Sequence, residues 1–205
     1  MHAEALTKEA AELFPRLARF SKFYLVGGTA MALQIGHRLS VDFDMFSGEK
    51  LKPNLLSKIN REFGDKKIAV TYRSPEQINL LIDNVKFTFF YYPYPVIEPL
   101  IKMKGVPTAS LIELAAMKAL AVGQRLSYKD YIDWYFLLKE KHITLGKVIE
   151  LAKKKFGGNF NDRLFLGQLV SADDIPVQKI DFLRNETDKD TVEKLLREKI
   201  QAFNI

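Results

Sequence analysis

Two short stretches, FYLVGGTAMALQ at residues 23–34 and VDFDMF at residues 41–46, decide the fold of this chain. The first joins four apolar strand formers to a Gly-Gly pair and then to good helix formers, so it predicts a strand, a tight turn and a helix. The second alternates apolar and acidic residues with period two, so it predicts a strand with Asp42 and Asp44 on one face. Together they predict a core that combines strands and helices.

The Gly-Gly turn indicates a site for phosphate. Glycine lets the backbone come close to a ligand, and the helix that follows offers free N–H groups and a partial positive charge. We therefore expect Gly27, Gly28 and Thr29 to hold nucleotide phosphates. A turn of this kind is more often only a turn, so the motif needs support from elsewhere in the sequence.

The pair of carboxylates supplies that support. Adjacent like charges repel unless a divalent cation lies between them, and Mg²⁺ bound by one or two carboxylates and by substrate phosphates is usual in phosphoryl transfer. If the two strands are neighbours, the glycine turn can face one cleft with Asp42 and Asp44. The pair therefore predicts a site for Mg²⁺ or Mn²⁺, although the exposed face of an edge strand would explain it equally well.

The rest of the chain completes an α/β (α+β) pattern. Periodicity predicts helices over residues 4–20 and 53–63, and β-branched and aromatic residues predict two or three strands within 67–72, 77–82 and 85–91. The stretch YPYP at residues 92–95 predicts the end of the sheet, because proline has no N–H to donate.

From about residue 108 the pattern predicts helices alone, the first opened by a capping box of Ser110 and Glu113. These helices are expected at residues 110–122, 127–138, 144–156, 160–169 and 190–203. We therefore expect an α/β core over 1–107 and a helical region over 108–205 that packs on it.

Composition excludes several classes of protein. The 205 residues include no cysteine, so disulfides, thiolate metal sites and a cysteine nucleophile are excluded, which suits the cytoplasm. No secretion signal and no membrane span are expected, because no apolar run approaches the ~20 residues a span needs. Residues 50–145 hold 15 basic and 9 acidic side chains. This excess would attract a nucleotide or RNA, although a solvated Lys-rich surface explains it too.

Several blocks of sequence resemble a known family. They are GGTA at 27–30, GHRLSVDFD at 36–44, FYYPYP at 90–95, SLIELAAMK at 110–118 and KDYIDWYFLL at 129–138. In this order they are similar to motifs of the AbiEii-type abortive-infection toxins, a branch of the DNA polymerase β-like nucleotidyltransferases. The ordered set is specific, whereas no single block would be.

The resemblance implies a mixed sheet flanked by helices and the transfer of a nucleoside monophosphate from a nucleoside triphosphate (NTP) to a hydroxyl. It implies metal binding by Asp42 and Asp44, phosphate contact by Lys118 and a downstream acidic motif at Asp130 and Asp133. The acceptor would be RNA, especially a tRNA 3′ end, or else a protein hydroxyl. A toxin role would further imply a separately encoded antitoxin.

The sequence around Lys118, Asp130 and Asp133 bears on the roles that the resemblance implies for them. Lys118 has almost only apolar neighbours, so it should face a cleft or an acid unless it extends along a helix edge to solvent. Asp130 and Asp133 share a helix face, where they could accept a proton, pair with Lys118, or form surface ion pairs with Arg125 and Lys129.

Two further positions bear on the proposed site. Arg38 and His37 precede the aspartates and could contact phosphate, although a loop histidine is more often solvated. Thr88 stands where related enzymes often carry a third carboxylate, and a hydroxyl is a poor Mg²⁺ ligand. The alternatives are therefore a catalytically degenerate nucleotide- or protein-binding module on the same fold, or an RNA-binding structural protein.

Overall fold

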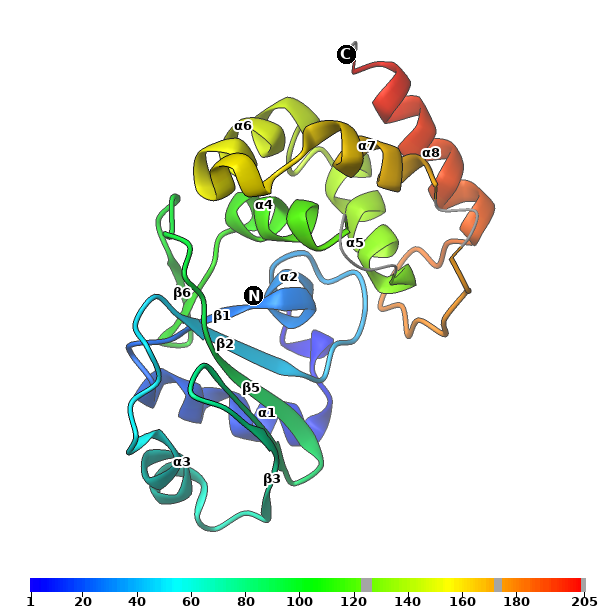
Figure 1. Cartoon of the computed structure of the whole chain (residues 1–205). Coiled ribbons are helices and arrows are strands. Elements are labelled where there is room, and N and C mark those ends of the chain that lie inside the picture. Colours follow the sequence, from blue (N-terminus) through cyan, green and yellow to red (C-terminus); the bar gives the residue numbers. More distant parts are fainter. Residues whose placement is uncertain (123–126, 172–174, 204–205) are drawn as a thin grey trace. The chain divides into compact units, whose positions relative to one another are not determined.

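The structure, a computed structural model, describes residues 1–122, 127–171 and 175–203 (Figure 1). The chain divides into two compact units, Met1–Ser110 and Leu111–Ile205. The first contains all the strands of the described residues and the second is helical, so the expected α/β (α+β) fold is confirmed.

A mixed sheet of seven strands forms the centre of the first unit within the residues described, in the order β3-β4-β5-β2-β1-β7-β6. Strand β2 lies antiparallel to β1 and parallel to β5, and β7 lies parallel to β1 on its other side. The strands are β1 Tyr24–Val26, β2 Phe43–Ser47, β3 Ile68–Arg73, β4 Gln77–Ile82, β5 Val85–Tyr91, β6 Ile101–Met103 and β7 Val106–Thr108.

One face of this sheet carries the apolar core of the first unit. Phe43 of β2 and Phe87 and Phe89 of β5 are fully buried there. They pack against rings from the helical segments, with Phe20 lying 5.1 Å from Phe89 and Phe63 lying 5.4 Å from Phe87 between ring centroids. The helical segments of the unit are η1 Ala3–Ala5, α1 Lys8–Leu13, η2 Phe14–Arg19, α2 Gly27–Ile35 and α3 Leu55–Phe63, and Figure 1 shows α1 and α3 on the side of the sheet opposite α2.

Two expectations for the first unit are wrong. The single helix over residues 4–20 is instead three short segments, because the side chain of Thr7 caps α1 and Pro15 lies in the first turn of a 3-10 helix. The sheet does not end at residues 92–95, because β6 and β7 return to it as a hairpin. Lys104 and Gly105 form its turn with φ of 46° and 84°. Pro107 and the shortness of both strands hide this hairpin in the sequence.

The second unit is built from helices whose ends the sequence largely marks. Thr144, Asn161 and Asp188 each cap a helix by accepting a hydrogen bond from a backbone N–H three residues ahead. The helical segments are α4 Leu111–Val122, α5 Tyr128–Lys139, α6 Leu145–Phe156, η3 Gly157–Asn159, α7 Asp162–Val170 and α8 Lys189–Gln201. No helix in the described part of the chain has the length and apolar character needed to cross a bilayer.

The capping box expected at the start of α4 is wrong. The hydroxyl of Ser110 has no hydrogen-bond partner among the residues described. Glu113 is fully buried and its Oε1 lies 2.5 Å from Nζ of Lys155 on α6. The carboxylate of Glu113 therefore joins α4 to α6, and the hydroxyl of Ser110 does not cap α4.

Candidate active site

Two charged side chains lie against the glycine turn, the carboxylate of Asp44 and the guanidinium of Arg38. Gly27 has φ of 75°, and a Cβ added to it would lie 2.5 Å from Oδ2 of Asp44. A Cβ on Gly28 would collide with Nη2 of Arg38 and would lie 3.6 Å from Oγ of Ser40. The absence of side chains at both positions is therefore what lets a carboxylate and a guanidinium approach the first turn of α2.

Sheet register brings Asp44 to this turn. Asp44 lies opposite Val26, the last residue of β1, so its side chain stands beside the start of α2. On its other side it lies opposite Thr88 of β5. Asp44 is half-buried, whereas Asp42 is exposed and comes one residue before β2 begins. The structure thus brings Asp44, Gly27 and Thr88 together, with Asp42 at the adjoining end of the strand.

A buried hydroxyl holds the loop that carries Asp42. Thr29 is 2% exposed, and its Oγ1 donates a hydrogen bond to the carbonyl oxygen of Asp42 and lies 2.8 Å from Oγ of Ser40. The side chain of Thr29 therefore positions the acidic segment, while its backbone N–H belongs to the open first turn of α2. Ser40 was not singled out in the sequence, although it lies within the GHRLSVDFD block.

Arg38 and His37 are buried, in contrast to the solvated loop residues that are common in such positions. His37 is fully buried and Arg38 is 4% exposed. Nη1 of Arg38 donates a hydrogen bond to the carbonyl oxygen of Leu39, 3.1 Å away. A buried guanidinium beside Gly28 places a permanent positive charge at the predicted phosphate site.

The donor set at this turn suits a hard divalent cation. Asp42 and Asp44 supply carboxylate oxygens, the ligands that Mg²⁺ and Mn²⁺ prefer, and Thr88 adds only a hydroxyl. Within residues 1–122, 127–171 and 175–203 no group of three or more His, Asp or Glu side chains is placed to hold a metal ion. Two carboxylates fit a cation whose other ligands come from substrate phosphates and water.

The three other sequence-predicted residues meet in the second unit. Nζ of Lys118 lies 2.7 Å from Oδ1 of Asp130 and 2.8 Å from Oδ2 of Asp133, and all three side chains are buried. Burial alone would lower the pKa of Lys118, but the charges of Asp133 and Asp130 outweigh it and raise that pKa. Lys118 therefore faces acids, as expected, and does not reach solvent along the helix edge.

Asp130 and Asp133 pair with Lys118 in the interior, whereas the sequence also allowed ion pairs at the surface. Asp130 is 3% exposed and Asp133 is fully buried, so neither is a surface residue. Arg125, one of the partners considered, lies outside the described residues.

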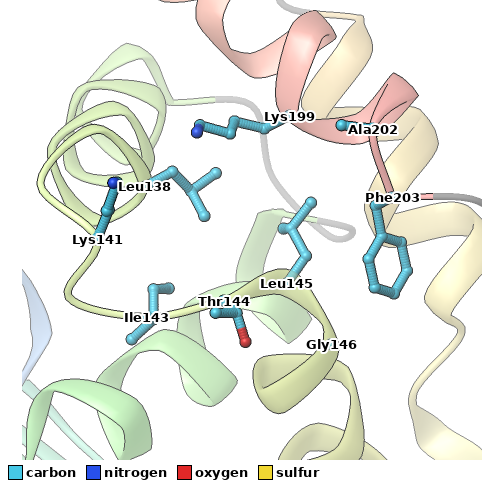
Figure 2. A pocket seen from close by; sticks show the side chains of 9 residues that line it. All are labelled: Leu138, Lys141, Ile143, Thr144, Leu145, Gly146, Lys199, Ala202 and Phe203. Carbon is cyan, nitrogen blue, oxygen red and sulfur yellow. The ribbon is translucent and has the colours of Figure 1, made fainter.

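Two pockets lined by described residues lie elsewhere. Figure 2 shows one, about 490 Å³, between the ends of α5 and α8 and the start of α6, with Leu138, Ile143 and Leu145 around it. Lys141, in the turn after α5, and Lys199 of α8 also line it. The other, about 220 Å³, adjoins Ser47 and the start of α3 and is lined by Lys22, Lys50, Lys52 and Lys58 among others. Neither includes Gly27, Asp42 or Asp44.

Three solved structures resemble this one along nearly the whole chain. They are a proposed nucleotidyltransferase from H. pylori (18% identity, TM-score 0.62, 97% of this chain and 99% of that one) and JHP933 from Helicobacter pylori (15%, 0.53, 97% of each). The third is MenT4, the nucleotidyltransferase toxin Rv2826c from Mycobacterium tuberculosis H37Rv (12%, 0.50, 100% and 97%). At these identities the likeness shows the fold alone.

Two comparisons of sequence add to this likeness of fold. The chain is 36% identical over 171 residues to aq_aa25, an uncharacterized protein of Aquifex aeolicus (strain VF5), with 82% of each chain covered. The model of one family, the nucleotidyl transferase AbiEii toxins of type IV toxin–antitoxin systems, matches residues 11–204. Because that match spans nearly every residue, the chain belongs to the AbiEii family.

Proposed function

We propose that this chain transfers a nucleoside monophosphate from an NTP to a hydroxyl of RNA, with a tRNA 3′ end as the favoured acceptor. The observation that carries the proposal is the approach of the Asp44 carboxylate to the glycine turn at the start of α2. This geometry puts an oxygen ligand for a metal beside a backbone that can hold phosphate.

Each group at the turn has a proposed task. Backbone N–H groups of Gly28 and Thr29 donate to phosphate oxygens, and Arg38 balances the charge of the phosphates. Asp42 and Asp44 are proposed to hold Mg²⁺ or Mn²⁺, which would supply positive charge to the reacting phosphate. The acceptor oxygen bonds to the α-phosphorus, the bond from that phosphorus to the bridging oxygen breaks, and pyrophosphate leaves.

The resemblance adds the buried triad to the same reaction. On this proposal Lys118 neutralises charge on the phosphates, and Asp130 or Asp133 accepts the proton of the attacking hydroxyl. The contacts of Lys118 with both carboxylates, at 2.7 and 2.8 Å, support the proposal by keeping the three groups together.

Incubation of the purified protein with each α-labelled NTP, Mg²⁺ and total tRNA tests the proposal. We expect one or more nucleotides to be incorporated, and ribonuclease but not protease to release the label. Asp44→Asn and Asp42→Asn should each lower the rate at least about 100-fold, since each removes a ligand charge where transition-state charge develops. Asp181→Asn, at an exposed residue, is the matched control.

Other outcomes point to the rival functions. Tight NTP binding without incorporation onto any acceptor would favour the degenerate binding module, for which Thr88 in place of a carboxylate is the motivating observation. Label released by protease would identify a protein acceptor. Stronger RNA binding by Asp42→Ala without any transfer would favour an RNA-binding structural protein.

A further inference from the structure

A row of aromatic side chains lies on the sheet face that carries Asp44. Phe46 follows Asp44 by one strand repeat on β2, and Phe90 lies opposite it in register on β5. The ring centroids of Phe46 and Phe90 are 5.1 Å apart. Tyr92 continues the row at 5.0 Å from Phe46, and Tyr94 follows at 5.1 Å from Tyr92. We call these four residues the ring row.

The ring row is distinct from the core of the unit. Phe43 and Phe89, which alternate with it along the strands, are fully buried on the opposite face, whereas every member of the row is half-buried. Cross-strand stabilisation of a sheet accounts for Phe46 and Phe90. It also covers Tyr92, whose backbone N–H donates to the carbonyl oxygen of Ser47 on β2, but it does not extend to Tyr94, which lies beyond the end of β5.

The ring row lies on the side from which an attacking hydroxyl would approach the phosphorus atom. Along β2, the glycine turn adjoins Asp44 at the strand's beginning, and the row starts at Phe46 on the other side of Asp44. In such a displacement the attacking and leaving oxygens lie roughly in line. If pyrophosphate rests on the turn at Gly28, the attacking hydroxyl approaches from the side of the rings.

We propose that the ring row stacks the unpaired bases at the 3′ end of the RNA acceptor and so delivers its terminal hydroxyl to Asp44. This inference rests on the proposed function and names the surface that the acceptor uses. Aromatic rings bind the face of any base, which suits a single-stranded end. Lys86 is exposed and alternates with Thr88 and Phe90 on the same face of β5, where it can attract backbone phosphate.

Binding without NTP tests the ring row independently of catalysis. The probes are a fluorescent RNA hairpin with a four-nucleotide 3′ overhang and the same hairpin with a blunt end, measured by anisotropy at fixed salt. Tyr92→Leu and Tyr94→Leu should weaken binding of the overhang about tenfold, a change typical of one lost base-stacking ring, and leave the blunt hairpin unchanged. Tyr92→Phe and Tyr94→Phe keep the ring and should bind as the wild type does.

Two controls separate stacking from damage to the fold. Tyr72→Leu removes an exposed tyrosine from β3, three strands away from β2, and should not alter binding. Tyr94 lies at the outer end of the row, beyond β5, so its substitution leaves every strand intact. Thermal unfolding of each variant identifies any general loss of stability.

Kinetics then distinguish the acceptor from the nucleotide. We expect the leucine variants to raise KM for the RNA with little change in KM for the NTP. A raised KM for the NTP alone, or equal binding of overhang and blunt hairpins by wild type and variants, would overturn the inference. Ring-dependent binding of the overhang without any transfer would support the ring row and refute the proposed transfer reaction.

Discussion

Position 27 requires glycine for two separate reasons. Its φ of 75° lies in the left-handed region, and a Cβ would also meet the carboxylate of Asp44. Gly27→Ala should therefore lower the free energy of unfolding by about 1–2 kcal/mol and abolish transfer, because either the backbone or Asp44 must move. Urea denaturation and the transfer assay measure the two effects.

Gly158 offers the matched control, since nothing lies within 4 Å of a Cβ added there. Gly158→Ala should retain both stability and activity. Wild-type transfer by Gly27→Ala would show that the close approach to Asp44 is not needed for the reaction.

Thr88 provides a test in which activity should increase. It lies opposite Asp44 in register, so Thr88→Asp would place a third carboxylate beside Asp44 of the proposed metal-binding pair. We expect the variant to reach half-maximal activity at a lower Mg²⁺ concentration, because a further oxygen ligand of opposite charge strengthens cation binding. Thr88→Asn, which adds no charge, serves as the comparison, and an unchanged Mg²⁺ dependence in Thr88→Asp would contradict a cation at Asp44.

Among the helices, buried ion pairs fix how α4 contacts its neighbours. Lys118 joins α4 to α5 through two aspartates, and Lys155 joins α6 to Glu113 of α4. Lys118→Met should lower the free energy of unfolding by about 3–5 kcal/mol, because it leaves carboxylates buried without their ammonium. Lys147→Met breaks only an exposed pair with Glu150 and should cost less than about 1 kcal/mol.

The same triad predicts a loss of stability at alkaline pH. The pKa of Lys118 is raised above its ordinary value of 10.5, so its contribution is complete below pH 10.5 and is lost as pH rises through the higher value in the folded chain. Burial also raises the pKa of Tyr131 to about 12, and its effect has the same sign. Urea titrations from pH 8 to 12 should show a smaller alkaline loss in Lys118→Met than in the wild type, and an equal loss would argue against the triad.

Elements with strong periodicity or clear end signals could be predicted from the sequence. The strands β4 and β5 and the helices of the second unit begin and end close to the expected residues, since Asp83-Asn84, Thr144 and Asp188 have local conformational preferences. The β6–β7 hairpin could not be found, because each strand has only three residues and is held by pairing with distant residues. The pair of Glu113 with Lys155 likewise joins residues 42 apart in sequence, and no local pattern shows it.

At the scale of the whole molecule, the sequence predicted which residues form the candidate site but not the contacts that hold them in place. The motif placed Gly27, Asp42 and Asp44 near one another only on the assumption that their strands are neighbours, which the register of β1 with β2 satisfies. The hydroxyl contacts of Thr29 and the extension of the ring row beyond β5 depend on how loops return to the sheet, and no local pattern encodes that. The family and the fold expected from the resemblance are confirmed.

The place of β7 in the sheet affects how a cell makes this toxin. Leu25 in β1 is paired with Thr108 and accepts a hydrogen bond from the backbone N–H of Ala109. A ribosome adds about 5–20 residues per second, so on the order of ten seconds separate the synthesis of β1 from that of its parallel neighbour. During that interval the strand leading into Gly27 is flanked on one side at most. A nascent chain, or one cut short by premature termination before residue 106, therefore carries β1 without its parallel neighbour, and the whole sheet can form only after half of the polypeptide has been translated.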